Sequence, residues 1–275
     1  SIAGSSGTDK IVQSINADQA LTDTSLTGQG TDTLSGIESA DLTGGAAANT
    51  IDATGFSGTA TITGGAANDT LTGGSGNDSL LGGDGEDVLN GGAGDDVIDG
   101  GANDDKVTQT VDGDQTLGDT LLTGQGTDTL AGIESAELTG GAGANTIDAS
   151  GFAAGSVTID GGAGNDTLSG GTGNDSITGG EGTDQLNQTA NIAQTLTDAQ
   201  ATGQGTDVLA TIETASLTGG DAANDIDASA FTLGAVTIDG GAANDTLTGG
   251  AGADSLVGGA GDDVLTGGAG TDALV

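Results

Sequence analysis

A nine-residue period constrains this chain more than any other feature of its sequence. The unit is Gly-Gly-x-Gly-x-Asp-x-U-x, where U is an aliphatic residue, and it fills three blocks, 64–108, 161–187 and 240–275. Each unit joins a glycine-rich turn to a strand that is too short to be stable alone. The middle side chain of this strand points to one side, and the side chains next to it point to the other. Repetition at a fixed short period is typical of a solenoid, in which each coil covers the next.

The turn residues indicate a cation. Glycine permits the positive φ angles that turn backbone carbonyls inward, and the Asp at position six adds a carboxylate. Carbonyl and carboxylate oxygens are hard donors that suit Ca²⁺ better than zinc or copper. The chain contains neither His nor Cys, which excludes nucleophilic triads and the usual zinc sites. We therefore expect a Ca²⁺-binding protein that is not an enzyme and has no other cofactor.

If two units make one coil, turns two units apart stack on the same edge. Cations are then shared between stacked carboxylates, which predicts the pairs Asp69/Asp87, Asp78/Asp96 and Asp87/Asp105 in the first block. The later blocks supply the pairs Asp166/Asp184, Asp245/Asp263 and Asp254/Asp272. The predicted metal ligands are Asp69, Asp78, Asp87, Asp96, Asp105, Asp166, Asp175, Asp184, Asp245, Asp254, Asp263 and Asp272, with Asp9 from a repeat remnant at the start and Asp32, Asp128 and Asp207 from degenerate repeats.

The charge balance supports bound cations. The chain has 41 Asp and Glu against 2 Lys and Arg, a formal charge of −39, so stacked carboxylates would oppose a compact state without counter-ions. The alternative is an acidic, glycine-rich disordered chain. Disorder is the state that we expect for the metal-free protein. The aliphatic residue at every position eight argues against disorder once calcium is bound.

A longer period lies above the nonapeptide. Three similar 31-residue spacers, 13–43, 109–139 and 188–218, each carry a Gly-Gln-Gly-Thr-Asp turn and an Ile-Glu pair. A nonapeptide with Asn at position six follows each spacer, and then a segment with a single Phe. These residues are Asn49, Asn145 and Asn224, and Phe56, Phe152 and Phe231. The super-repeats run approximately over 4–99, 100–178 and 179–275, and the Asn turns are expected to weaken calcium binding beside them.

The spacers are expected to form further coils of one continuous solenoid over 1–275. Aliphatic residues recur in them eight or nine apart, as at Leu122, Leu130 and Leu138, whereas a separate globular insertion would need a core that 31 residues cannot supply. The phenylalanines are interpreted as core plugs, with a recognition role as the alternative. Lys10 and Lys106 are interpreted as outward-facing strand residues.

With Gly-Gly-x-Gly-x-Asp-x-Leu-x blocks and spacers such as Gly-Thr-Asp-Thr-Leu-x-Gly-Ile-Glu at 30–38, the chain resembles the RTX (repeats-in-toxin) family, above all its large bacterial surface proteins. The resemblance implies an all-β, right-handed parallel β-roll with Ca²⁺ between stacked turns. It also implies type I secretion and folding on meeting extracellular calcium, at the cell surface or beyond it.

Two functions compete at this stage. The first is a structural protein of the cell surface or extracellular space, such as an adhesin stalk, an S-layer or a filament subunit. The alternative is a calcium-triggered folding and secretion module of a toxin or enzyme. Neither end of the chain carries a polar cap, which predicts either a longer tandem array or end-to-end self-association. A cell-envelope polysaccharide is a further expected partner; nucleic acid and membrane insertion are not expected. Ice binding has one motif match, at 171–175.

Overall fold

The protein is built from strands and turns alone. The computed structural model describes all 275 residues and contains 32 strands and no helix, which confirms the all-β prediction; consequently no helix in it is long and apolar enough to cross a membrane. The chain divides into two compact units, 1–109 with 119–137 and 110–118 with 138–275. The division falls in the second spacer, within strands β13 (Lys106–Thr110) and β17 (Ser135–Thr139). One continuous solenoid over 1–275 stays a prediction.

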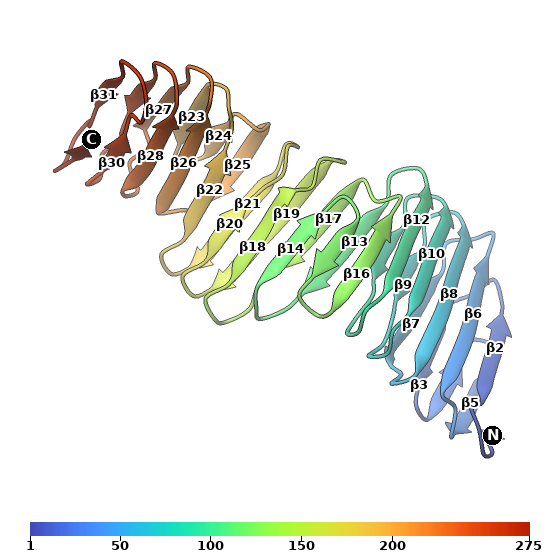
Figure 1. The fold of residues 1–275 in the computed structure, drawn as a ribbon. Helices are drawn as coiled ribbons and strands as arrows, with labels where there is room; N and C mark the ends of the chain where they lie inside the picture. The colour runs from blue at the N-terminus through green and yellow to red at the C-terminus, as the bar shows by residue number, and fades with distance from the viewer. The chain divides into compact units, whose positions relative to one another are not determined.

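Unit 1 consists of two facing sheets of mostly parallel strands (Figure 1). One sheet has the order β2 (Lys10–Ser14), β6 (Ser39–Gly45), β8 (Thr59–Ala66), β10 (Ser79–Asp84), β12 (Val97–Ala102), β16 (Thr127–Ala131), β15 (Leu121–Thr123). The other has the order β1 (Ile2–Ala3), β5 (Thr31–Ser35), β4 (Ser25–Thr27), β3 (Gln19–Thr22), β7 (Thr50–Gly55), β9 (Thr70–Thr72), β11 (Val88–Asn90), β13.

Unit 2 has the same construction. One sheet has the order β14 (Gln115–Gly118), β18 (Thr146–Gly151), β20 (Thr167–Ser169), β22 (Gln185–Thr189), β26 (Thr214–Gly220), β28 (Val236–Gly241), β30 (Ser255–Val257), β32 (Ala273–Leu274). The other has the order β19 (Ser156–Ala163), β21 (Ser176–Glu181), β25 (Thr206–Ala210), β24 (Gln200–Thr202), β23 (Gln194–Thr197), β27 (Asp225–Ala230), β29 (Thr246–Thr248), β31 (Val264–Thr266).

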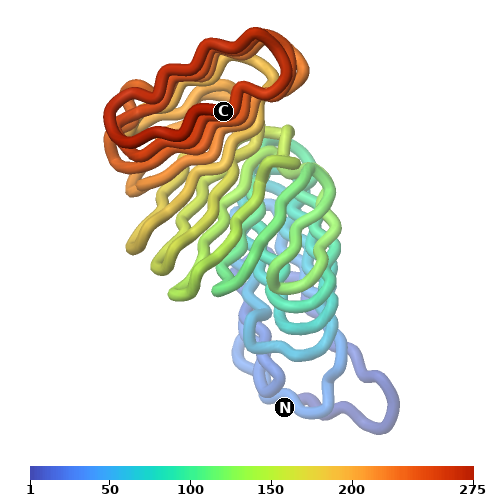
Figure 2. Tube along the Cα trace, turned by 60° about the vertical axis from the view of Figure 1, so that its left-hand side comes forward, coloured from blue at the N-terminus to red at the C-terminus, as the bar shows by residue number.

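The register explains the nine-residue period. Leu71 of β9 pairs with Leu89 of β11, which pairs in turn with Val107 of β13. Each nonapeptide therefore crosses from one sheet to the other, and two make a coil. Figure 2 shows the coils stacked one on the next. The position-eight side chains stack inside each unit, where Leu71, Leu89 and Val107 are fully buried. In the last two repeats this residue is less covered, since Leu265 is half-buried and Leu274 is 47% exposed. The parallel β-roll predicted from the repeat is confirmed.

The spacers depart from a further parallel coil. In the first spacer, β3, β4 and β5 form an antiparallel meander, of which β5 pairs in parallel with β1 and β3 with β7. The third spacer repeats this in β23, β24 and β25. The meander strands join the sheets of the nonapeptide blocks, so the spacer is part of the roll rather than a separate insertion.

Buried glutamines fix the meander. Gln188 Nε2 donates to Gln194 Oε1 at 3.0 Å and to the Thr202 carbonyl at 2.8 Å, and Gln194 Nε2 donates to the Thr218 carbonyl at 2.8 Å. Both glutamine side chains are buried. Because a buried amide must find partners, the pair orders the interior of the spacer where the aliphatic ladder is interrupted.

The three phenylalanines are core residues. Phe56, Phe152 and Phe231 are each at most 1% exposed, which confirms the core-plug interpretation and leaves no ring surface for recognition. Each lies in a tight turn, closed for example by the Phe56 N–H donating to the Ala53 carbonyl at 2.9 Å. These turns lack the glycine pair of the nonapeptide, and their rings are buried in the core.

Candidate calcium sites

The position-six aspartates form ladders along the edges of each unit. The Asp69 N–H donates to Asp87 Oδ1 at 2.7 Å, and the Asp87 N–H donates to Asp105 Oδ1 at 2.7 Å. In unit 2 the Asp166 N–H donates to Asp184 Oδ1 at 2.8 Å. One carboxylate oxygen of each stacked Asp is therefore occupied by the backbone of the adjacent coil, as the predicted stacking requires.

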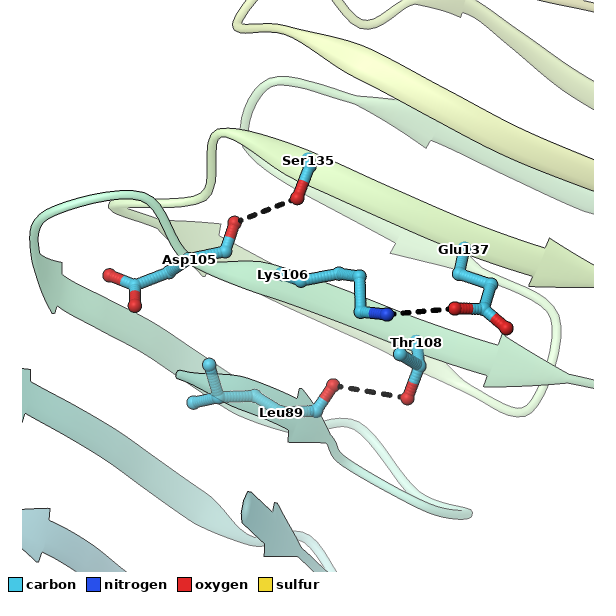
Figure 3. Close-up of polar contacts among 6 residues, drawn as sticks. All are labelled: Leu89, Asp105, Lys106, Thr108, Ser135 and Glu137. Carbon is cyan, nitrogen blue, oxygen red and sulfur yellow. Dashed lines mark hydrogen bonds and ion pairs between the residues drawn. The ribbon is translucent and has the colours of Figure 1, made fainter. Parts of the chain in front are cut away.

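The second oxygen is unpartnered in seven of these side chains. The buried Oδ2 atoms without a hydrogen-bond partner are those of Asp69, Asp87, Asp96, Asp105, Asp166, Asp184 and Asp245. A buried anionic oxygen without a partner is strongly unfavourable, and the lysines do not supply one. Lys106 Nζ lies 2.8 Å from Glu137 Oε2, and Figure 3 shows its side chain running toward Glu137 while the Asp105 carboxylate points the other way. Lys10 pairs with Asp41.

Backbone carbonyls converge on these free oxygens. A Cβ placed on Gly82 would collide with both Asp87 Oδ2 and the Gly100 carbonyl oxygen, and one on Gly64 with Asp69 Oδ2 and the Gly82 carbonyl oxygen. The first glycine of the repeat is thus required because the oxygens of two coils share its space. No three carboxylates gather at one point, so the donor set is mixed carboxylate and carbonyl. Hard oxygens around an unpaired buried charge fit Ca²⁺.

The second glycine distinguishes two kinds of turn. In turns with a free Oδ2 it has positive φ, as at Gly65 (+125°), Gly83 (+119°) and Gly101 (+109°); we call these open turns. Judged by this φ, the open turns are those that end at Asp69, Asp87, Asp96, Asp105, Asp166, Asp184, Asp245, Asp263 and Asp272. The unpartnered Oδ2 is buried in the first seven of them.

In closed turns, the second glycine donates its N–H to the carboxylate of its own repeat. Gly74 N–H donates to Asp78 Oδ2 at 2.6 Å, while Asp78 Oδ1 accepts the Ala60 N–H at 2.6 Å. Asp175 and Asp254 have the same two bonds. All three lie beside a Phe turn: a Cβ on Gly74 would collide with the Phe56 carbonyl oxygen. Since both oxygens are satisfied by backbone, these aspartates have no free ligand atom.

The Asn turns are also closed. Asn49 Oδ1 accepts the Gly45 N–H at 2.9 Å, and Asn145 and Asn224 repeat this bond to Gly141 and Gly220. The neutral side-chain amide thereby accepts the same backbone N–H that the Asp78 carboxylate accepts in its own repeat. The expected weakening of calcium binding beside Asn turns has this geometry as its physical basis.

The predicted pairs fall into three groups. Both members are buried and open in Asp69/Asp87, Asp87/Asp105 and Asp166/Asp184. Asp245 is buried and open, and its stacked partner Asp263 is half-buried. The pairs Asp78/Asp96 and Asp254/Asp272 each contain one closed turn.

The ligands predicted outside the blocks also differ among themselves. Asp128 and Asp207 are buried in the ladders, where their Oδ1 atoms accept the N–H groups of Asp96 and Asp175 at 3.0 Å. Asp9 is half-buried and closed, because its Oδ2 accepts the Ser5 N–H at 2.6 Å. Asp32 is exposed, 3.6 Å from the amino group of Ser1.

Burial shifts the protonation of the ladder. Desolvation raises the pKa of Asp96 to about 7 and the pKa values of Asp105 and Asp207 to about 6. It also raises the pKa values of Asp69, Asp78, Asp87, Asp128, Asp166, Asp175 and Asp184 above the ordinary range. Without a cation, burial therefore makes protonation of these carboxyls easier than in water, and protons and calcium compete for them.

Glutamates of the spacers are ladder members that the sequence did not reveal. Glu134 Oε2 accepts the Asp105 N–H at 2.9 Å, Glu213 Oε2 the Asp184 N–H at 2.9 Å and Glu38 Oε2 the Asp9 N–H at 2.8 Å. Each Glu lies 29 residues after the Asp whose N–H it accepts, whereas stacked Asp residues within a block are 18 residues apart. The strands of the meander account for the additional residues. The available signal was the Ile-Glu pair found at the same place in all three spacers.

Open turns, backbone carbonyl oxygens near the free Oδ2 atoms and stacked carboxylates together define a calcium-binding β-roll. The sequence profile of the RTX calcium-binding nonapeptide repeat (4 copies) matches residues 54–89, 81–108, 137–152, 158–187 and 234–274. These segments cover just over half of the chain, which belongs to the RTX calcium-binding nonapeptide-repeat family. RTX repeats bind Ca²⁺ between turns, so this protein takes several ions, and proteins with such repeats are typically secreted. No curated protein matches the chain.

Proposed function

We propose that this protein is a calcium-dependent structural component of the bacterial cell surface or extracellular space, as in an adhesin stalk, an S-layer or a filament, and not an enzyme. The observation that carries the proposal is the distribution of unpaired buried carboxylate oxygens, which occur in all three nonapeptide blocks. Calcium is then a structural component throughout both units rather than a ligand of one regulatory site.

The chemistry suits an extracellular setting. Modular calcium sites of extracellular proteins have dissociation constants of about 10⁻⁴–10⁻³ M, far above cytosolic calcium. With a formal charge of −39, the chain resists compaction until cations bind. An unfolded chain inside the cell that folds outside is also the form that type I secretion requires. The acidic surface leaves a cell-envelope polysaccharide, bridged by calcium, as a candidate partner.

The alternative is a folding and secretion module attached to a toxin or enzyme. The three near-equivalent super-repeats favour the structural role, because a folding trigger needs only one block. The sequence of the full gene product discriminates between the two: further super-repeats support the structural role, and a flanking catalytic domain supports the module.

Circular dichroism and small-angle X-ray scattering of the purified chain, with and without calcium, test the proposal. We expect a coil spectrum and an expanded chain in chelator, and a β spectrum with a smaller radius of gyration in millimolar calcium. A chain that keeps its β signal in chelator contradicts it.

Self-association belongs to the same proposal. The coils of the roll join through backbone pairing, as β30 does with β32, and the same backbone pairing can join the coils of two copies. We expect light scattering to rise with protein concentration in calcium alone. A chain that stays monomeric at high concentration removes self-association and leaves calcium folding standing.

A further inference from the structure

The three spacers share an unusual backbone conformation, which is strained in the third spacer. The residue before the Ile-Glu pair is Gly36, Gly132 or Thr211, with φ of +61°, +56° and +51°. A β-branched residue rarely adopts positive φ, and such strain persists only where the surroundings impose it. Thr211 nevertheless has the same positive φ as Gly36 and Gly132, so the surrounding structure requires this backbone conformation at the position.

The conformation directs a carbonyl into the end of the ladder. A Cβ on Gly100 would collide with the Gly132 carbonyl oxygen and lie 2.6 Å from Asp105 Oδ2; at Gly179 the Thr211 carbonyl oxygen and Asp184 Oδ2 take these places. Within a block, the Gly82 carbonyl oxygen and Asp69 Oδ2 crowd Gly64 in the same way. The spacer carbonyl therefore replaces the carbonyl of a nonapeptide turn.

The spacer glutamate replaces the next carboxylate. Glu134 Oε2 accepts the Asp105 N–H at 2.9 Å, as Asp87 Oδ1 accepts the Asp69 N–H within the block. Asp105 and Asp184 are completely buried, and their Oδ2 atoms have no hydrogen-bond partner. The first two blocks thus end on a free carboxylate oxygen beside a spacer carbonyl, with a spacer glutamate bonded to the backbone of the same Asp.

We propose that the spacers close the calcium ladders with two sites that lie outside the nonapeptide pattern. One is formed by Asp105, the Gly132 carbonyl and Glu134, and the other by Asp184, the Thr211 carbonyl and Glu213. Two carboxylates and a carbonyl are hard donors suited to Ca²⁺. Such an ion fastens the meander of the spacer to the block before it, so the spacer folds only when that block is loaded.

The first spacer provides an internal control. Glu38 Oε2 accepts the Asp9 N–H at 2.8 Å, the same bond, but Asp9 Oδ2 already accepts the Ser5 N–H at 2.6 Å. Because the Asp9 oxygen that corresponds to the free Oδ2 of Asp105 is already hydrogen-bonded, we expect Asp9 and Glu38 to lack this kind of site. Loss of a hydrogen bond to Glu and loss of a calcium ion can therefore be separated within one chain.

The test counts calcium ions on the full chain by native mass spectrometry and calcium titration. Glu134→Gln and Glu213→Gln keep an oxygen for the Asp N–H and remove the charge. We expect one ion fewer in each variant and two fewer in the double variant. Glu38→Gln and Glu137→Gln, which remove the same charge elsewhere, should bind as many ions as the wild type. An unchanged ion count and midpoint in the double variant overturns the proposal and leaves the glutamates as hydrogen-bond acceptors.

A measurement on the wild-type chain guards against variants that do not fold. The sequence has six glutamates, so selective ¹³C labelling of Glu carboxylates isolates their infrared bands. Calcium coordination should shift a fraction of the antisymmetric carboxylate band corresponding to Glu134 and Glu213. A Glu band that stays unshifted in saturating calcium also overturns the proposal.

Discussion

Asp87→Asn separates the ligand role of an open turn from its hydrogen-bonding role. Asp87 Oδ1 accepts the Asp69 N–H at 2.7 Å, and its Oδ2 is buried without a partner beside the Gly100 carbonyl. Asparagine has nearly the same shape and keeps an oxygen for the Asp69 N–H. It replaces the anionic Oδ2 with an amide nitrogen that cannot bind Ca²⁺.

The magnitude follows from mass action. At about ten times the dissociation constant, each bound ion stabilises the folded chain by about 1.4 kcal/mol. Asp87 stacks between the turns of Asp69 and Asp105 and therefore borders two sites, so loss of one or both ions lowers the free energy of unfolding by about 1.4–3 kcal/mol in calcium. In calcium-free buffer the penalty should disappear, because the substitution removes a buried charge.

Two matched variants complete the experiment. Asp78→Asn leaves one backbone N–H without its acceptor in a closed turn, which should cost about 1–3 kcal/mol without removing an ion. Glu86→Gln removes the same charge from an exposed side chain and should have little effect. Circular dichroism during calcium titration gives the folding midpoint, which should rise for Asp87→Asn. Equal midpoints for Asp87→Asn and Glu86→Gln would refute the distinction between open turns and surface acids.

Three further predictions follow from the core, the ladder and the surface. First, because burial raises the pKa of Asp96 to about 7 and those of Asp105 and Asp207 to about 6, the folded metal-free chain binds more protons than the unfolded chain. Its stability should be greatest below the ordinary Asp pKa and fall as pH rises through about 6–7; a chain in decalcified buffer that gains no β signal on acidification from pH 7.5 would contradict this. Second, Phe231→Ala should lower the free energy of unfolding in calcium by about 3–5 kcal/mol through the cavity it leaves, as denaturant titration measures, whereas a loss below 1 kcal/mol would mean that the turn collapses freely. Third, Lys106→Met should change thermal stability by less than about 1 kcal/mol, since its ion pair with Glu137 is exposed; a larger loss would show that Lys106 neutralises the ladder.

Much of the fold was determined locally. The nonapeptide carries its turn, its strand and its core residue within nine positions, and repeating it places Leu71, Leu89 and Val107 in one buried ladder. The repeat also identified every position-six Asp and predicted which of them stack. A rule of this kind can be read from the sequence because each coil meets only its neighbours.

What the sequence could not decide depends on the neighbouring coil. Asp78 and Asp87 occupy the same position of the same motif. The repeat of Asp78 lies beside the Phe56 turn, and there the Gly74 N–H donates to the Asp78 carboxylate. The repeat of Asp87 lies beside a glycine turn, and its Oδ2 stays free. Likewise, Glu134 joins the ladder 29 residues after Asp105 because an antiparallel meander absorbs the extra chain. Motif position fixes which atoms a residue offers, but only stacking between coils decides whether those atoms meet an N–H or remain for a cation.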